Sequence, residues 1–293
     1  MQVLQILFDV VAPVFLVALV GYLWARSGNK LDSAFVALLV NTIATPCLIL
    51  DTLLRSGVTA SALSQMAGVA AVTMVVTFTT AWLLVKAMGL PVKTYLPSLT
   101  WSNAGNMGLP LSLFAFGEQG LSLAIAFFTV SSLSNYTIGL GVAAGGVSFR
   151  EILRMPIVYA IALALFLIVT GYKLPLFAGR AVQLLGGIAV PLMLLSLGYA
   201  LATLKFDSLR LNLVLSLARL IGGFAIGWGV AMLFGLDGVA RGVVVLQSAM
   251  PAAVLNYLFA ARYDNDPQEI AGLVVLSTAL AMILLPIFLW TVV

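Results

Sequence analysis

The sequence predicts an all-α polytopic membrane protein with ten transmembrane helices. Only 8% of its 293 residues are charged, while 62% are hydrophobic. The mean hydropathy is +1.16, which lies far above that of soluble domains. So few charges cannot cover the surface of a soluble domain of this length. Composition and hydropathy together therefore exclude a soluble globular protein.

Ten apolar stretches are long enough to cross a bilayer, which requires about 20 residues each. They are joined by short segments with glycine and charged residues, and they lie at 6–25, 33–54, 59–85, 94–116, 120–143, 152–171, 181–203, 210–234, 239–261 and 269–292. The first stretch begins without a basic cluster and runs to Trp24 without a small-residue cleavage pattern. We therefore interpret it as a transmembrane helix and not as a signal peptide.

Two of these stretches are interrupted in corresponding places. The fourth contains Asn103-Ala-Gly-Asn106-Met-Gly-Leu-Pro110, and the ninth contains Gln247-Ser-Ala-Met-Pro251. A proline removes a backbone donor and frees a carbonyl, and lipid offers no water to satisfy that carbonyl. Paired breaks of this kind are typical of the substrate site of a transporter.

The two halves of the chain are predicted to be repeats of five helices, over residues 1–146 and 147–293. Pro46 and Pro191 each lie in the second span of a set of five, and Pro110 and Pro251 each lie in the fourth. Because five is odd, the second set enters the membrane from the opposite side, and the repeats are inverted. This arrangement brings the two broken helices together at mid-membrane.

The distribution of basic residues predicts that both termini lie outside, because Lys and Arg concentrate in cytoplasmic loops. In that orientation the inner loops hold Arg26, Lys30, Lys86, Lys93, Arg150, Arg154, Lys205, Arg210 and Arg262, and the outer loops hold Arg55, Lys173, Arg180 and Arg241. The net charge of +4 is then explained by loop asymmetry, so we expect no nucleic-acid partner.

Polar residues near the breaks are the candidate substrate-binding residues. The carboxamides of Asn103, Asn106 and Gln247 lie within two turns of the prolines and need partners in an apolar phase, either a substrate or a neighbouring helix. Arg219 lies in the middle of the eighth span and is a candidate anion ligand, although it could instead bind a backbone carbonyl or snorkel. The remaining candidates are Pro110, Asn135, Tyr136, Pro251 and Asn256, with Asn41, Thr42 and Thr45 as weaker ones.

Several function classes lack the residues they require. The chain has no histidine, no His/Cys cluster for zinc, no paired aspartates for a magnesium-bound pyrophosphate and no phosphate-binding loop. We therefore expect neither an enzyme nor ATP-driven transport, and no metal or cofactor. Acidic residues in the spans lie near their ends, as Asp9, Asp51 and Glu118 do, which disfavours an antiporter built on paired buried carboxylates.

The span order and the two proline-centred motifs resemble the auxin efflux carrier family, which includes plant auxin exporters and bacterial malonate and malate permeases. The resemblance implies a fold related to bile-acid symporters, with spans one, two, six and seven as a scaffold. Spans three to five and eight to ten would form a transport unit that moves like an elevator, with the fourth and ninth helices crossing at Pro110 and Pro251. The short connection at 145–150 favours the microbial branch, and the third span lacks the charges of plant members.

The expected function is secondary transport of a small organic anion, such as malonate, malate or an auxin-like acid, across the cytoplasmic membrane. The alternatives are a sodium-coupled bile-acid-like symporter, a membrane-embedded ligand sensor and a channel. Half-helices that begin at a break direct their amide groups into the cavity, which suits a carboxylate. Membrane lipid is the other expected partner, and the sequence leaves open whether the protein forms a homodimer.

Overall fold

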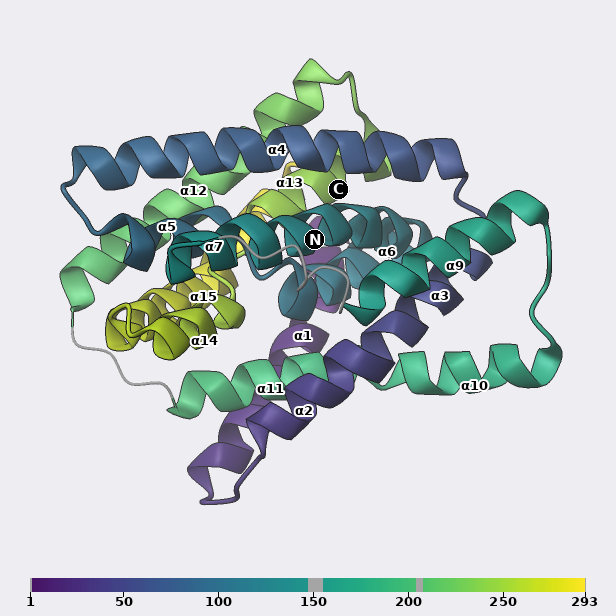
Figure 1. Cartoon of the computed structure of the whole chain (residues 1–293), viewed down its shortest axis with the longest axis horizontal. Helices are drawn as coiled ribbons and strands as arrows, with labels where there is room; N and C mark the ends of the chain where they lie inside the picture. Colours follow the sequence, from purple (N-terminus) through teal and green to yellow (C-terminus); the bar gives the residue numbers. More distant parts are fainter. Residues whose placement is uncertain (1, 147–154, 204–207, 293) are drawn as a thin grey trace.

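The computed structural model describes residues 2–146, 155–203 and 208–292, and it is helical throughout these ranges (Figure 1). No strand occurs in them, and the only β-type pairing is an isolated bridge between Ser102 and Ala252. Six helical segments are long and apolar enough to cross a membrane: Ser33–Arg55, Ala60–Ala87, Ala104–Ala144, Leu176–Thr203, Leu209–Leu233 and Pro267–Trp290. Two shorter apolar helices accompany them, Ala12–Arg26 and Pro156–Thr170. The chain is therefore an all-helical, multi-pass membrane protein.

The elements follow one another with few long connections. Their bounds are α1 Gln2–Arg26, α2 Ser33–Leu39, η1 Val40–Ala44, α3 Thr45–Arg55, α4 Ala60–Ala87, α5 Val92–Thr100, η2 Ala104–Gly108, α6 Leu109–Ser134, η3 Asn135–Gly139, α7 Leu140–Ala144, α9 Pro156–Thr170, α10 Leu176–Gly187, α11 Ala189–Thr203, α12 Leu209–Leu233, α13 Gly238–Ser248, α14 Val254–Tyr263 and α15 Pro267–Trp290. The segments η1, η2 and η3 are π-helices. Three predicted loop cations, Arg150, Arg154 and Lys205, lie outside the described residues.

Helix α6 contains the turn that the sequence places between the fourth and fifth spans. Gly117 has φ 64° and ψ −159°, a conformation that only glycine adopts readily, so the chain bends sharply within this helical segment. The predicted joint at 117–120 therefore coincides with a real change of direction. Gly28, Gly57 and Gly171 likewise end helices with positive φ.

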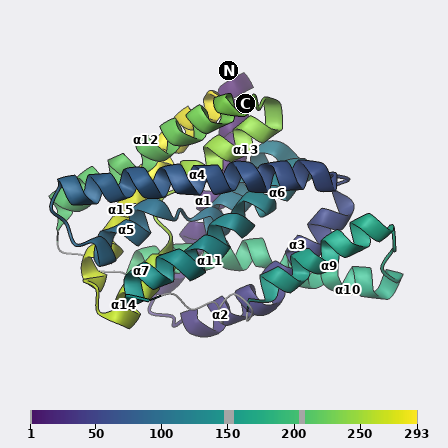
Figure 2. The ribbon, with the colours of Figure 1, turned by 45° about the horizontal axis from the view of Figure 1, so that its top comes forward.

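The helices pack as two groups. In the first, α1 runs along α11 and α3 packs on α9 and α10; in the second, α4 packs on α6, while α12 packs on α13 and α15. Figure 1 shows α3, α9 and α10 together at one end of the molecule, and Figure 2 shows the same grouping after a turn of 45°. The α1–α11 contact is close because Gly21 and Gly198 have no side chain: a Cβ at either position would collide with the backbone of the other helix.

Candidate substrate site

The two predicted breaks cross each other. The chain leaves the helical conformation at Trp101–Asn103, between α5 and η2, and at Ala249–Ala253, between α13 and α14. The backbone N–H of Asn103 donates to the carbonyl of Pro251 at 2.7 Å, beside the Ser102–Ala252 bridge. The two interrupted helices are thus joined at their centres by strand-like backbone pairing.

The crossing lies at Ser102 and not at Pro110, where the sequence motif placed it. Pro110 is buried and is the second residue of α6, which continues without interruption from η2, so it lies beyond the break and inside the helical run that begins at Ala104. In the fourth span the proline therefore marks where regular α-helix resumes after the break. Pro251, by contrast, lies within the break, and its carbonyl accepts the bond from Asn103.

The half-helices that end at the crossing have their last carbonyls capped by buried side chains. Asn256, which is 2% exposed, donates from Nδ2 to the carbonyls of Pro97 (3.3 Å) and Trp101 (3.0 Å) at the end of α5. Arg219, which is 3% exposed, donates from Nη2 to the carbonyl of Ser248 (3.0 Å) at the end of α13. These carbonyls form the negative ends of the helix dipoles, and both ends are covered.

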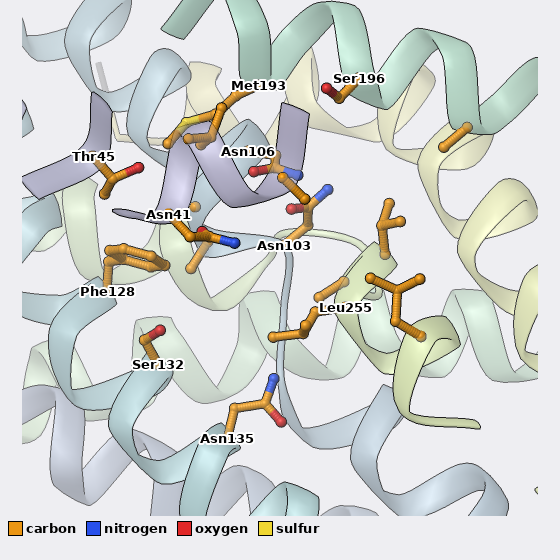
Figure 3. Close-up of a pocket in the computed structure, with 18 of the residues that line it drawn as sticks. Asn41, Thr45, Asn103, Asn106, Phe128, Ser132, Asn135, Met193, Ser196 and Leu255 are labelled. Carbon is orange, nitrogen blue, oxygen red and sulfur yellow. The ribbon is translucent and has the colours of Figure 1, made fainter. Parts of the chain in front are cut away.

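The half-helices that begin at the crossing are left open. The residues that precede them, Asn103 before η2 and Ala253 before α14, make no side-chain capping hydrogen bond. Both beginnings line one cavity of about 480 Å³ (Figure 3). Its wall consists of Ser33, Ala34, Ala37, Val40, Asn41, Thr45, Ser102, Asn103, Ala104, Gly105, Asn106, Phe128, Ser131, Ser132, Asn135, Tyr136, Met193, Ser196, Ala200, Ala253, Val254, Leu255 and Leu258. The positive ends of two helices therefore face the same space.

All three π-helical segments contribute to this wall, and each brings an asparagine. Asn41 comes from η1, Asn106 from η2 and Asn135 from η3. Figure 3 shows Asn41, Asn103 and Asn106 gathered near one another, with Asn135 across the cavity. Because π-helical turns are rare and are frequent at functional sites, their convergence on one cavity makes it the candidate functional site.

Several polar atoms of the cavity wall are buried without a hydrogen-bond partner. They are Nδ2 of Asn103, Oδ1 of Asn135 and Oγ1 of Thr45, on residues that are 4%, 5% and 3% exposed. A buried polar group without a partner costs about 1–3 kcal/mol. A ligand or water that reached the Asn103 amide would recover this free energy, which makes Asn103 a candidate donor of the site.

The structure divides the predicted site residues into two sets. Asn103, Asn106, Asn135 and Tyr136 line the cavity. The other five, which are Pro110, Arg219, Gln247, Pro251 and Asn256, do not line it. Three of these five belong to the crossing itself, as described above for Pro251, Arg219 and Asn256.

Gln247 connects the two broken helices. It is fully buried, its Nε2 donates to Oγ of Ser112 at 3.3 Å, and its backbone carbonyl accepts from Oγ of Ser102 at 3.0 Å. Its amide also packs against Gly108, where a Cβ would collide with it. Arg219 borders a separate cavity of about 290 Å³ between α4 and α12.

Residues from α11 complete the cavity and were not among the predicted candidates. Met193 and Ser196 lie on the wall opposite the crossing, and Phe128 of α6 adds an aromatic surface. A serine in an apolar helix carries little sequence signal, because its hydroxyl can bond to its own backbone. The nearby Pro191, in the second span of its set, was the one available indication.

A multi-pass helical protein with a cavity that carries carboxamides and hydroxyls at the crossing of two broken helices has the architecture of a membrane transporter. The family described as "membrane transport protein" matches residues 6–145 and 142–289. The chain belongs to this family, which is the auxin efflux carrier family.

Two archaeal relatives carry the name of an uncharacterised transporter. One, from Methanothermobacter thermautotrophicus, is 29% identical over 302 residues and covers 97% of both chains. The other, from Methanocaldococcus jannaschii, is 27% identical over 199 residues and covers 64% of both chains. This chain is similar to them along most of its length in the first case and about two thirds in the second.

Proposed function

We propose that the protein is a secondary transporter that carries a small organic anion, a carboxylate such as malonate, malate or an auxin-like acid. The observation that supports this most is that side chains cap the negative helix ends at the crossing but not the positive ones. The negative ends of α5 and α13 are capped by Asn256 and Arg219, whereas the positive ends of η2 and α14 open into the cavity. Such a cavity attracts an anion without a cationic side chain on its wall.

The size and chemistry of the cavity suit a small carboxylate. About 480 Å³ lies within the range of small-molecule sites, which run from about 300 to 1,000 Å³. The donor groups on the wall are carboxamides and hydroxyls, with no lysine or arginine among the lining residues. Amide donors hold a carboxylate more weakly than a full ion pair does, and a carrier must release what it binds.

We further propose that the protein has a ten-helix fold of two inverted repeats and transports its substrate by an elevator-type movement. Both termini would lie on the outer side of the cytoplasmic membrane. The cavity lies between elements of the two packing groups: α3 and α11 of the first group form one wall together with α2 and η1, and α6 of the second group forms the other together with η2, η3 and α14. A substrate at this boundary would move with the second group if that group slid along the first. The scaffold would then comprise spans one, two, six and seven, and the remaining spans would carry the substrate.

The proposal is tested by counterflow of labelled malonate or malate in proteoliposomes, after a thermal-shift screen of mono- and dicarboxylates selects the best ligand. Asn103→Ala and Asn106→Ala should each reduce saturable counterflow at least tenfold. Asn29→Ala is the matched control, because Asn29 is an exposed carboxamide that bonds only to Ser27 in the part of the chain described. Full counterflow by both cavity variants would refute the assignment of this cavity as the substrate site. If the wild-type protein bound no carboxylate, the proposal that its substrate is an organic anion would be refuted.

A further inference from the structure

A second cavity, of about 550 Å³, lies where α3, the end of α9 and the start of α10 meet. These elements lie together at one end of the molecule in both ribbon views (Figures 1 and 2). Arg55 is the last residue of α3, Thr170 ends α9 and Leu176 begins α10. Three apolar helices therefore start or stop at this cavity, which places it at the level of the lipid headgroups.

The polar rim of this cavity has an excess of positive charge. It contains Arg55, Lys173 and Arg180, with Asp51 as its only carboxylate. Asp51 is occupied by Arg55, whose Nε and Nη2 bond to its two oxygens at 2.9 and 2.6 Å. Lys173 and Arg180 form no ion pair with any residue that the structure describes. Two cations are thus left without a counter-charge.

The rest of this wall is apolar and continues onto the outer surface of the helices. Leu54, Leu167, Ile168, Leu174 and Val182 form the wall. Beside them, three large apolar side chains on α9 and α10 are exposed: Phe166 is 61% exposed, Val169 76% and Phe177 79%. In a membrane such side chains face acyl chains, so the cavity joins a cationic rim to a lipid-facing surface.

We propose that this cavity binds an anionic phospholipid, with the phosphate between Lys173 and Arg180 and an acyl chain along the apolar wall. A hydrated soluble anion would gain nothing from that wall, and a zwitterionic lipid would bring its own cationic group beside the two cations and add no net negative charge. Basic pockets between transmembrane helices bind anionic headgroups for these reasons. Tyr172, which lines the same cavity, has the aromatic ring and hydroxyl that favour the membrane interface. The lipid would stabilise the packing of α3 against α9 and α10. This proposal does not depend on which substrate the protein transports.

The test measures thermal unfolding of the purified protein in detergent, with phosphatidylglycerol or phosphatidylcholine of the same acyl chains added. Phosphatidylglycerol should raise the Tm more than phosphatidylcholine does, because binding to the folded state stabilises it. The double variant Lys173→Gln/Arg180→Gln should lose this difference, with the affinity falling about fivefold for each cation removed. The matched control is Lys86→Gln/Lys93→Gln, which removes two span-end cations elsewhere and should keep the difference. Native mass spectrometry of the same samples counts the bound lipids.

Three results would overturn the proposal. Equal Tm shifts with both lipids would remove the charge requirement. A full phosphatidylglycerol shift in the Lys173/Arg180 variant would place the lipid elsewhere. If glycerol phosphate without acyl chains gave the whole shift, the cavity would be a site for a soluble anion and not for a lipid.

Discussion

The amide of Asn135 donates from Nδ2 to Oδ1 of Asn256 over 3.3 Å, and this bond determines which edge of Asn135 faces the cavity. Asn256 donates from Nδ2 to the carbonyls of Pro97 and Trp101, and these two bonds fix the orientation of its amide. Its Oδ1, which is an acceptor, therefore faces Asn135. Asn135 must therefore present its nitrogen, while its oxygen lies against Gly139. Figure 3 shows the nitrogen of Asn135 turned toward the other labelled asparagines and its oxygen turned away from them.

Asn256→Ala should reduce the preference of the site for a carboxylate over the corresponding carboxamide. Without Asn256 the Asn135 amide is free to turn, and an oxygen facing the cavity would repel an anion. We expect the ratio of the two affinities, measured by competition in the thermal-shift assay, to fall several-fold. The free energy of unfolding should fall by about 1–3 kcal/mol as well, because the Trp101 carbonyl loses its partner.

Asn265→Ala separates the effect on selectivity from the loss of stability. Asn265 also donates from Nδ2 to a backbone carbonyl, that of Ala143 at 2.9 Å, but it does not line the cavity. This variant should lower the Tm and leave the affinity ratio unchanged. An unchanged ratio in Asn256→Ala would show that Asn256 does not orient Asn135.

Arg219→Met should weaken anion binding with little change in stability. Removing the guanidinium loses a charged hydrogen bond worth about 1.5–3 kcal/mol. It also relieves the cost of a cation within a transmembrane helix, about 2.5–3.5 kcal/mol on insertion scales. These terms nearly cancel, whereas the uncovered negative end of α13 would oppose an anion at the crossing. Ligand affinity and Tm are measured for the same samples. The control is Arg219→Lys, which keeps the charge and should retain most of the affinity.

Gln247→Met should leave ligand affinity within about twofold of the wild-type value. Gln247 is fully buried between the broken helices and does not line the cavity, and Met has a similar volume. Only Oγ of Ser112 loses a partner, so the Tm should fall modestly. A large loss of affinity with normal folding would instead place Gln247 in contact with the substrate.

Gly198→Ala should destabilise the protein, although alanine normally favours a helix by about 1 kcal/mol over glycine. The new Cβ would collide with the backbone of α1 at Ala18, which has no side-chain freedom to adjust. We expect a loss of about 1–3 kcal/mol in the free energy of unfolding. Gly68→Ala is the control, because a Cβ there meets open space, and its Tm should stay the same or rise.

The helical membrane class follows from composition alone, because hydropathy is a property of whole segments. The approximate positions of the breaks also follow, since glycine, asparagine and proline interrupt apolar runs. The crossing at Ser102 does not, because a proline lies within one break, as Pro251 does, and within the helix that follows the other, as Pro110 does, and the sequence does not distinguish the two.

For a related reason, the sequence could not predict which polar residues bond to backbone carbonyls and which line the cavity. Asn256 and Asn103 are the same residue type close to the two breaks, yet one bonds to carbonyls and the other faces the cavity. Which of these occurs depends on the carbonyls that a distant helix brings within reach. The Asn135–Asn256 bond joins residues from the two halves of the chain, and no local pattern reveals it.

The π-helical segments make the cavity depend on residue spacing as well as on residue type. A π turn holds one residue more than an α turn, and η3 at Asn135–Gly139 lies within an otherwise regular helix. Deleting a single residue there would restore regular α-helix, and the residues of the former π turn would take new positions around the helix axis, while the helix on either side would keep its register. Every amino acid named at the site would still be present in the sequence, but the asparagine would point elsewhere. We therefore expect related chains that keep this cavity to keep the length of these short segments as well as the asparagines.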